Sequence, residues 1–311
     1  LGQQSPPKRN VEDRKEDFNE IYNEFIKDKA KEQSSRCSQC GVPFCQVHCP
    51  LSNNIPDWLK LTAEGRLEEA YQLSQSTNNM PEVCGRICPQ DRLCEGNCVI
   101  EQSGHGTVTI GSVEKFITEN AWEKGWIKPI EIKTERSESI GIIGAGPAGL
   151  ACAEELRKQG FKITVYDRYD RSGGLLIYGI PNFKLEKNVV QRRTNLLEKS
   201  GIKFVHNFEI GKDSTLKDLR DKHDAVLIAK GKVQNIDIVV GAQDFRFIGG
   251  SFGAASGEAF IAGAQNAIAN NVPYIFFSCS GGQRMMESSI ALMQMSRTAL
   301  AVNELKKNNV P

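Results

Sequence analysis

The sequence predicts a helical, cysteine-rich domain followed by an α/β part built on parallel sheet, and three observations carry this prediction. Eight of the ten cysteines lie in two short segments, CSQCGVPFCQVHCP at residues 37–50 and CGRICPQDRLCEGNC at residues 84–98. Around these segments, apolar residues recur at three- and four-residue intervals, as on one face of a helix. From residue 139 onward, apolar strands alternate with Gly-rich turns and helices, which is typical of a parallel sheet.

The density of cysteines indicates a metal centre. Nothing in the sequence resembles a secretory signal peptide or a transmembrane segment, so we expect a reduced, cytoplasmic setting, which disfavours disulfides. Zinc favours pairs of closely spaced ligands, and only Cys37 and Cys40 offer such a pair. An iron-sulfur centre fits the spacing better, because Cys45 follows these two and is itself followed by Cys49 and Pro50. This is the ferredoxin pattern, in which the fourth cysteine binds the other cluster, and the second segment would complete both clusters.

Length, composition and charge are those of an ordinary soluble protein. The 311 residues can form two or more domains, and they are 40% hydrophobic and 25% charged. The formal net charge of +1 gives no electrostatic reason to expect a nucleic-acid or membrane partner. The first residue is Leu, and the last follows a helical pattern, so we expect the chain to be a fragment.

Helices are expected on both sides of the first cysteine segment and after the second. One is predicted over residues 11–32, with an apolar face of Phe18, Ile21, Tyr22, Phe25 and Ile26. Residues 55–82 predict two helices broken at Gly65, and residues 109–125 predict another. Buried clusters need an apolar shell that excludes water. The side chains available for it are Trp58, Leu59, Leu61, Leu67, Ala70, Tyr71 and Leu73.

The first part of the α/β region carries a dinucleotide fingerprint. An apolar strand leads into Gly144-x-Gly146-x-x-Gly149, Pro147 begins a helix at a favourable position, and a second strand ends at Asp167. Gly144 permits the tight turn, Gly146 lets backbone N–H groups approach a pyrophosphate, and Gly149 lets helix and strand pack closely. Asp167 would accept hydrogen bonds from ribose hydroxyls. The fingerprint does not decide between FAD and NAD.

The residues after Asp167 continue the α/β pattern. Gly173 and Gly174 stand where the backbone must pass close to a flat or charged group. A helix is then expected from about residue 185, a strand pair over residues 201–211, and a short strand in DAVLIAKG, residues 224–231.

Residues from about 12 to 230 resemble the small subunit of NADPH-dependent glutamate synthase and, in part, the N-terminal region of dihydropyrimidine dehydrogenase. The motifs that carry the resemblance are SRCSQCGVPFC, HCPLSNNIPDW, TNNMPEVCGRICPQDRLCEGNC, VTIGSVEKFI, GAGPAGLACAEELRKQG and GGLLIYGIPNFKLEK. The resemblance implies two [4Fe-4S] clusters, FAD at the fingerprint, and electron flow from NADPH through FAD and the clusters to the glutamate synthase large subunit.

The same resemblance assigns residues to these cofactors. One cluster would be held by Cys37, Cys40, Cys45 and Cys98. The other would be held by Cys49, Cys88 and Cys94, with Glu114 as the fourth ligand and Cys84 as the alternative. The implied FAD-binding residues are Gly144, Gly146, Pro147, Ala148, Gly149, Asp167, Gly173 and Gly174. A second fingerprint for NADPH, which the family requires, does not follow in this sequence.

The C-terminal residues predict a further α/β unit. Strands are expected at residues 236–240 and 274–278, each followed by a Gly-rich turn and a helix. The turns carry Gly249, Gly250 and Gly253, and Gly281 and Gly282. Backbone N–H groups at such a turn can stabilise an enolate or oxyanion, although tight packing explains the glycines equally well.

From about residue 224 onward the chain resembles the β subunit of the acetyl-CoA carboxylase carboxyltransferase, on the motifs FIGGSFGAASGE and SGGQRMMESSIALMQMSRTA. The resemblance implies a crotonase-like fold, an oxyanion hole at Gly281 and Gly282, an acyl-CoA site shaped by residues 249–257, carboxybiotin as the carboxyl donor, and a carboxyltransferase α subunit as partner. We therefore expect a chimera whose seam lies within residues 224–234.

Together these observations predict three parts: an α-helical iron-sulfur domain over residues 1–132, an incomplete FAD-binding Rossmann-like domain over residues 133–230, and a partial crotonase-like α/β unit over residues 231–311. The first functional hypothesis is an electron-transfer flavoprotein of the glutamate synthase type. The second is an acyl-CoA-binding carboxyltransferase piece, and the third is an iron-sulfur module without turnover.

Overall fold

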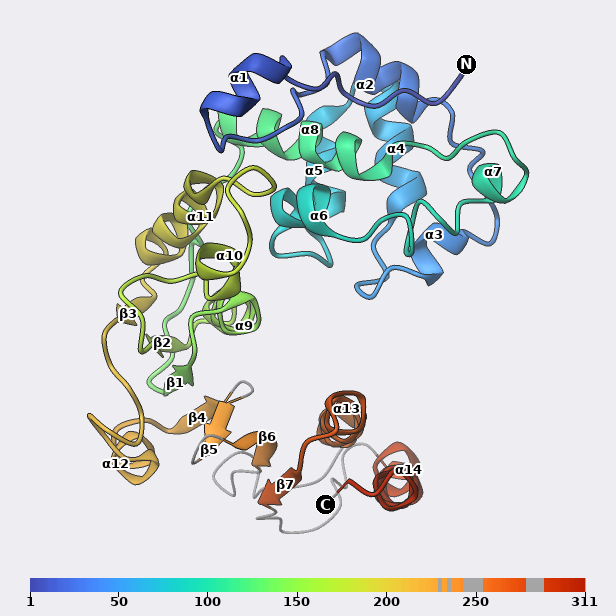
Figure 1. The fold of residues 1–311 in the computed structure, drawn as a ribbon. Helices are drawn as coiled ribbons and strands as arrows, with labels where there is room; N and C mark the ends of the chain where they lie inside the picture. Colours follow the sequence, from blue (N-terminus) through green and yellow to red (C-terminus); the bar gives the residue numbers. More distant parts are fainter. Residues whose placement is uncertain (229–230, 234–235, 243–253, 278–287, 311) are drawn as a thin grey trace. The chain divides into compact units, whose positions relative to one another are not determined.

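The computed structural model describes residues 1–228, 231–233, 236–242, 254–277 and 288–310 (Figure 1). Contacts within the chain divide it into two compact units. The first unit comprises Leu1–Lys133, Leu150–Gly160 and Arg171–Ile202. The second unit comprises Thr134–Gly149, Phe161–Asp170 and Lys203–Pro311.

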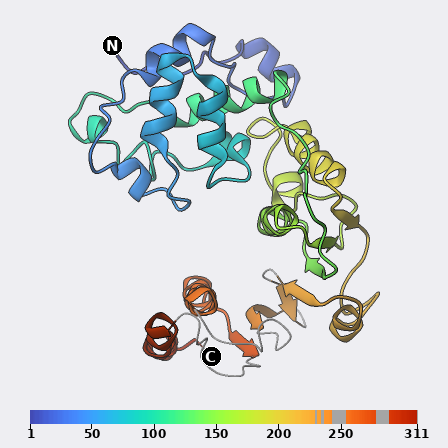
Figure 2. The ribbon, with the colours of Figure 1, turned by 180° about the vertical axis from the view of Figure 1, so that it is seen from behind.

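Helices build the cysteine-rich part of the first unit. They are α1 (Val11–Glu16), α2 (Lys27–Ser34), α3 (Phe44–Val47), α4 (Ile55–Glu64), α5 (Leu67–Gln75), α6 (Pro81–Ile87), α7 (Val99–Gln102) and α8 (Ile110–Glu123). The long helix α8 is in contact with α2, α4, α5 and α6 (Figure 1). Seen from behind, α4 and α5 lie side by side (Figure 2). The predicted helical domain is therefore present, with α8 as its central element.

Local chemistry sets the ends of α4 and α5. Pro56 lies in the first turn of α4, where its missing N–H leaves no helical hydrogen bond unmade. Gly65 follows α4 with φ +83°, in the left-handed region, and its N–H donates to the Leu61 and Thr62 carbonyls. The prediction of two helices broken at Gly65 is confirmed.

A single apolar core joins these helices to the cysteines. Trp58, Leu59 and Ile117 are each 1% exposed or less. The indole Nε1 of Trp58 donates to Asn53 Oδ1 over 2.7 Å, so the polar end of this buried ring is satisfied. Four cysteines pack against this core: Cys37, Cys45, Cys49 and Cys98.

The single helix predicted over residues 11–32 is wrong. Helix α1 ends at Glu16, α2 begins at Lys27, and the residues between them are not helical. There the backbone bonds to distant segments: the Ile21 N–H donates to the Phe183 carbonyl over 3.2 Å, and the Asn23 N–H donates to the Pro7 carbonyl over 2.9 Å. These tertiary hydrogen bonds replace the i to i−4 bonds of a helix, and Phe18 stays 75% exposed.

Two further helices of the first unit follow the fingerprint in sequence. They are α10 (Leu175–Tyr178) and α11 (Lys187–Lys199), and α11 matches the helix expected from about residue 185. Helix α9 (Pro147–Lys158) begins in the second unit and continues in the first.

The second unit contains a parallel sheet in the order β3-β2-β1-β4. Its strands are β1 (Ser139–Ile143), β2 (Lys162–Tyr166), β3 (Lys203–Val205) and β4 (Ala225–Ile228). The strand, helix, strand prediction for the fingerprint is confirmed. The strand pair expected over residues 201–211 is not, because only β3 forms there and Ile210 makes one isolated bridge to Ser214. Helix α12 (Leu216–Lys222) follows, and β4 then pairs in parallel with β1.

A second sheet in the same unit has the order β5-β6-β7. Its elements are β5 (Gly231–Val233), β6 (Ile236–Ala242) and β7 (Tyr274–Phe277), with helices α13 (Ala254–Asn270) and α14 (Ser288–Lys307). Strands β6 and β7 are parallel, as expected for an α/β unit, whereas β5 is antiparallel to β6 and was not predicted. Gly249, Gly250, Gly253, Gly281 and Gly282 lie outside the described residues.

Within the described ranges, none of the helices combines the length and the apolar character that crossing a bilayer requires.

Candidate functional site

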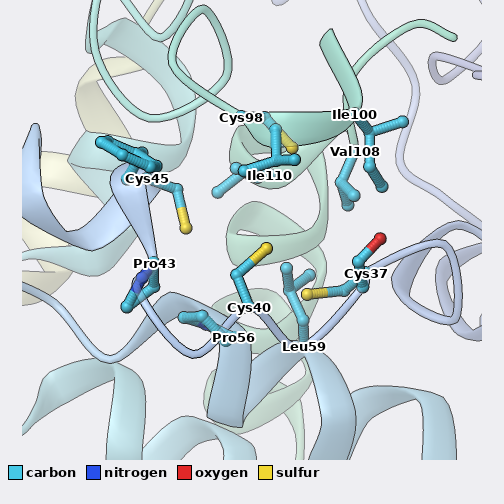
Figure 3. Close-up of a pocket in the computed structure, with 13 residues that line it drawn as sticks. Cys37, Cys40, Pro43, Cys45, Pro56, Leu59, Cys98, Ile100, Val108 and Ile110 are labelled. Atoms are coloured by element: carbon cyan, nitrogen blue, oxygen red, sulfur yellow. The ribbon is translucent and has the colours of Figure 1, made fainter. Parts of the chain in front are cut away.

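Four cysteines from separate parts of the chain line one cavity in the first unit. Cys37, Cys40, Cys45 and Cys98 line this cavity, whose volume is about 20 Å³. Figure 3 shows their sulfur atoms directed inward between apolar side chains. The apolar lining includes Pro43, Pro56, Leu59, Ile100, Val108 and Ile110. These are the four cysteines that the sequence assigned to one cluster, and the fold brings them together.

Short turns and helix ends position these thiols. Cys37 follows α2, where its N–H donates to the Ser34 carbonyl over 3.1 Å. Cys45 lies in α3, and Cys98 is the residue that precedes α7. Backbone hydrogen bonds hold the three segments in place, and the short cysteine side chains therefore reach the cavity directly.

The cavity disfavours isolated thiolates. Burial, together with charge repulsion from the neighbouring Cys37 and Cys98, raises the pKa of Cys45 to about 12. Burial also raises the pKa of Cys37, against hydrogen bonds from Gln39 that lower it. The Gln39 side-chain amide donates to Cys37 Sγ over 3.3 Å. Four thiolates in this apolar space need a positively charged centre, and the iron of a [4Fe-4S] cluster is such a centre.

The second set of predicted ligands also gathers in the first unit. The charge of Cys88 interacts with those of Glu114, Cys94 and Cys49. Cys94 is buried, and that burial raises its pKa. A hydrogen bond from the Cys84 thiol lowers the pKa of Cys88, and the same bond raises the pKa of Cys84. Cys88 therefore ionises more readily than Cys84 and Cys94.

Glu114 is a buried carboxyl beside these thiols. Burial raises its pKa well above the usual range, and the nearby Cys84 adds to the effect. Asn78 donates to Glu114 Oε1 over 3.4 Å, and Ser74 donates to the same oxygen over 3.5 Å. Glu114 and Cys84 both lie next to Cys88, so both alternatives for the fourth ligand stay open. Across the described ranges, no three His, Cys, Asp or Glu side chains converge closely enough to hold one metal ion.

The fingerprint loop has the geometry that a dinucleotide needs. Gly144 has φ +101°, and its N–H donates to the Tyr166 carbonyl over 2.7 Å. A Cβ on Gly149 would lie 1.9 Å from the Gly144 carbonyl oxygen, whereas a Cβ on Gly146 would meet nothing within 4 Å. The start of α9 can therefore pack against the turn only because residue 149 is glycine. The space beside Gly146 is free for a ligand. Pro147 and Ala148 form the first turn of α9.

Asp167, the residue after β2, is hydrogen-bonded to this loop. Its Oδ2 accepts the Ala145 N–H over 2.6 Å, and its Oδ1 accepts the Tyr169 N–H over 2.8 Å. Each oxygen retains a second lone pair that could accept a ribose hydroxyl. The sequence placed Asp167 correctly at the strand end but gave no sign of its bond to Ala145.

Gly173 and Gly174 form a turn in the first unit. Their φ angles are +126° and +52°. A Cβ on Gly173 would lie 2.5 Å from Ile177 Cγ1 and 2.9 Å from Val190 Cγ1, so this glycine allows the turn to pack on α10 and α11. The described contacts therefore give Gly173 a packing reason that sequence reasoning missed.

Sequence reasoning also missed Glu95, next to Cys94. Its carboxylate accepts the Gly111 N–H at the start of α8 over 2.9 Å. A carboxylate at this end satisfies unpaired N–H groups and the helix dipole. Since α8 also carries Glu114, this bond ties the second cysteine segment to the helix that presents the carboxyl candidate.

Known protein families and relatives match most of the chain. Residues 14–126 match the family model described as dihydropyrimidine dehydrogenase domain II, 4Fe-4S cluster, and residues 142–195 match an NAD(P)-binding Rossmann-like domain. The glutamate synthase [NADPH] small chain of Azospirillum brasilense is 65% identical over 236 residues, which cover 76% of this chain and 49% of that protein. The corresponding Escherichia coli small chain is 48% identical over 231 residues, covering 74% and 49%.

These comparisons establish homology to glutamate synthase small chains over about three quarters of the chain. The chain spans about half the length of these relatives. Residues 182–311 match a carboxyl transferase domain. Among solved structures, Mycobacterium tuberculosis FprA in complex with NADPH aligns with 22% identity and a TM-score of 0.28 over 32% of this chain and 25% of that one, which is too weak to support an argument.

Proposed function

We propose that residues 1–230 act as an electron-transfer module of the NADPH-dependent glutamate synthase type, with two [4Fe-4S] clusters and FAD. The single observation that carries the proposal is the cavity lined by Cys37, Cys40, Cys45 and Cys98. These four residues are spread over 62 positions of the sequence, yet their thiols face one apolar space. The homology to glutamate synthase small chains supports the same assignment.

The bound groups would supply the redox chemistry, since FAD accepts a hydride and iron-sulfur clusters pass single electrons. The chain's own residues bind and shield these groups. The thiolates of the first cavity would hold one cluster, and the buried side chains of Leu59, Val108 and Ile110 keep water away from it. A dry shell of this kind is one of the factors that set a cluster's reduction potential.

The second cluster would be held by Cys49, Cys88, Cys94 and Glu114. Support comes from the mutual electrostatic interaction of these groups and from the burial of Glu114. Coordination to iron would ionise this carboxyl and remove the need to keep a proton in the core. Cys84 is the alternative ligand. Substitution of each in turn distinguishes them, since only loss of the true ligand should change the spectrum of the second cluster.

FAD would bind at the loop from Gly144 to Gly149. The open space at Gly146 suits a pyrophosphate at the start of α9, and Asp167 suits a ribose hydroxyl. The resemblance to glutamate synthase small subunits assigns Gly173 and Gly174 to FAD binding as well.

The glutamate synthase large subunit would be the partner. An apolar patch beside the first cavity supports this proposal: Val42, Phe44, Val47, Leu51 and Val99 are 41–63% exposed. Phe44 and Val99 also line the cavity, so part of this exposed apolar surface lies at the cavity itself. Residues 37–56 contain no Asp, Glu, Lys or Arg. Depletion of charge with retention of aromatic and aliphatic side chains is typical of the centre of a protein interface.

Anaerobic purification tests the function directly. We expect a brown protein with about eight iron atoms and one FAD per chain, as two cubane clusters require. Substitution Cys37→Ser should remove the first cluster and about half of the iron. Cys152→Ser, on α9, is the matched control, because Cys152 belongs to neither predicted ligand set, and the iron content of this variant should stay unchanged. A colourless protein that contains zinc and no iron would refute the proposal.

The carboxyl transferase match supports a second candidate function for the C-terminal residues. In this proposal, residues 231–311 form a crotonase-like piece that binds acyl-CoA and pairs with a carboxyltransferase α subunit. The carboxyl group would pass from carboxybiotin to the acyl-CoA with release of biotin, and Gly281 and Gly282 would supply the oxyanion hole for this transfer. Both glycines lie outside the described residues. Calorimetric binding of acetyl-CoA that Gly282→Val abolishes would support this function; absence of binding would reject it.

The seam between the two homologies would lie within residues 224–234. Amplification across codons 215–245 from source DNA tests whether one gene encodes both parts. Recovery of a single continuous product supports a natural fusion, whereas recovery of two separate genes identifies the fusion as an artefact.

A further inference from the structure

A buried ion pair joins the helix that ends at Cys88 to helix α11. Arg193, on α11, donates from Nε to Glu82 Oε1 over 2.7 Å and from Nη2 to Glu82 Oε2 over 2.9 Å. The Glu82 side chain is 0% exposed and the Arg193 side chain 5% exposed. Two parallel hydrogen bonds of this kind fix direction as well as distance.

The Arg193 guanidinium stays charged in this buried pair. Burial lowers the pKa of Arg193, but the attraction and hydrogen bonds of Glu82 outweigh burial and raise the pKa above its usual value. Removal of one partner would leave the other charge uncompensated in the core. The pair is therefore a rigid link and not a loose surface contact.

On one side, the link reaches the second group of cysteines. Glu82 lies in the first turn of α6, and Cys88 is the residue that ends this helix. A Cβ on Gly85 would lie 2.7 Å from the Lys115 backbone nitrogen, so α6 and α8 meet at backbone contact. Helix α6 is thus held against α8, and a displacement of Glu82 along the helix would also displace Cys88.

On the other side, the link reaches the glycine turn. Val190 contacts the position where Gly173 would carry a Cβ, at 2.9 Å, and it precedes Arg193 by three residues on α11. Residues three apart on a helix share a face. The same face of α11 therefore packs against the Gly173–Gly174 turn through Val190 and binds α6 through Arg193.

A neighbouring contact strengthens the attachment of α11. Arg192 Nη1 donates to Glu119 Oε2, on α8, over 2.7 Å. Its guanidinium lies 4.8 Å from the centre of the Trp122 ring, within range of a cation–π interaction. Two consecutive arginines therefore fix the rotation of α11 about its own axis relative to α6 and α8.

We propose that Glu82 and Arg193 are positioning residues that lock α6 onto α11 and hold Cys88 in register with the Gly173–Gly174 turn. The inference rests on the proposed function, in which Cys88 binds the second cluster and the glycine turn belongs to the FAD site. Neither Glu82 nor Arg193 touches a cofactor. Their role is to keep the ligand helix and the flavin-side turn in one fixed arrangement.

The test replaces both partners in the full chain with apolar residues of similar size, Glu82→Leu together with Arg193→Met. Such a replacement of a buried pair is commonly tolerated by the fold. It also leaves the net charge of the pair unchanged. A shift in the electron paramagnetic resonance spectrum or midpoint potential of the second cluster would then indicate a displaced ligand, because the net charge near the cluster is the same as in the wild type.

We expect the double variant to retain wild-type iron and FAD content, with amide exchange in α6 faster by about tenfold or more and a shifted spectrum of the second cluster. Arg193→Lys keeps the positive charge but cannot make two parallel hydrogen bonds to Glu82. It should give a smaller shift of the spectrum in the same direction. Glu69→Gln is the matched control: it breaks the Arg66–Glu69 pair on α5, whose side chains are both 52% exposed, and should change neither readout.

Unchanged exchange and an unchanged spectrum in the double variant would overturn the positioning role. Loss of the second cluster from both the double variant and Arg193→Lys would also overturn it, because the pair would then be needed for cluster retention itself. A wild-type chain that binds neither iron nor FAD would instead refute the proposed function.

Discussion

Substitution of Gly149 by alanine should damage the fingerprint loop more than the same change three residues earlier. The new Cβ would lie 1.9 Å from the Gly144 carbonyl oxygen. The contacted atom belongs to the backbone and cannot rotate away. The start of α9 must therefore move away from the turn after β1.

The size of the effect follows from that distance. The gap must widen by about 1 Å before it reaches 3.0 Å, below which real Cβ contacts essentially never occur. Forcing an extra methyl group into a packed site typically costs about 1–3 kcal/mol. Because the opposing atom is fixed, we expect about 3 kcal/mol for Gly149→Ala, near the top of that range.

Urea unfolding and FAD binding measure the two consequences separately. With a slope of about 1–3 kcal/mol per molar urea, the unfolding midpoint of Gly149→Ala should fall by about 1–3 M. Gly146→Ala is the matched control, because its Cβ meets nothing within 4 Å. It should keep the wild-type midpoint but bind FAD at least about tenfold more weakly, since its methyl group occupies the space of the pyrophosphate.

A wild-type midpoint for Gly149→Ala would refute the reasoning about loop closure. Wild-type FAD affinity for Gly146→Ala would refute the reasoning about the open side of the loop. A loss of stability in Gly146→Ala equal to that in Gly149→Ala would show that the two glycines do not have the different roles assigned to them.

Two further predictions concern the cores of the two units. Trp58→Phe should lower the free energy of unfolding by about 1–3 kcal/mol, because the buried Asn53 oxygen loses the indole donor at 2.7 Å; Trp126→Phe, at a partly buried ring, should cost less in the same urea titration. His223 lies with Nε2 2.8 Å from the Tyr166 hydroxyl, and burial, aided by the neighbouring lysine, lowers its pKa from 6.5. Because the folded pKa lies below the unfolded one, protonation favours the unfolded chain. The stability that neutral His223 contributes is therefore present above about pH 6.5 and lost as the pH falls through the lowered pKa. His223→Gln should flatten this part of the pH profile, and an unchanged profile would contradict the assignment.

Local sequence was sufficient to predict the fold wherever a single nearby residue type determines the backbone conformation. Gly65 ends α4 because glycine adopts the left-handed conformation without strain. The fingerprint, with its strand, tight turn and helix, appears where the glycine spacing placed it. The strands near residues 236 and 274 were found from apolar runs alone.

Local sequence failed where distant segments compete for the same backbone. Residues 17–26 have the apolar spacing of a helix, yet Ile21 bonds to the Phe183 carbonyl instead. The strand pair expected over residues 201–211 is reduced to β3, because only this short run pairs with β2. No periodicity within a short window contains information about such partners.

The candidate sites divide in the same way. The spacing of the cysteines was enough to predict iron-sulfur clusters, and the spacing of the glycines was enough to predict a dinucleotide, because ligand spacing and backbone freedom are local properties. The resemblance grouped Cys98 with Cys37, Cys40 and Cys45, and the tertiary structure placed the four side chains around one cavity. It alone also paired Glu82 with Arg193, 111 residues away, because a buried charge is stable only beside its opposite and the folded chain selects which one that is.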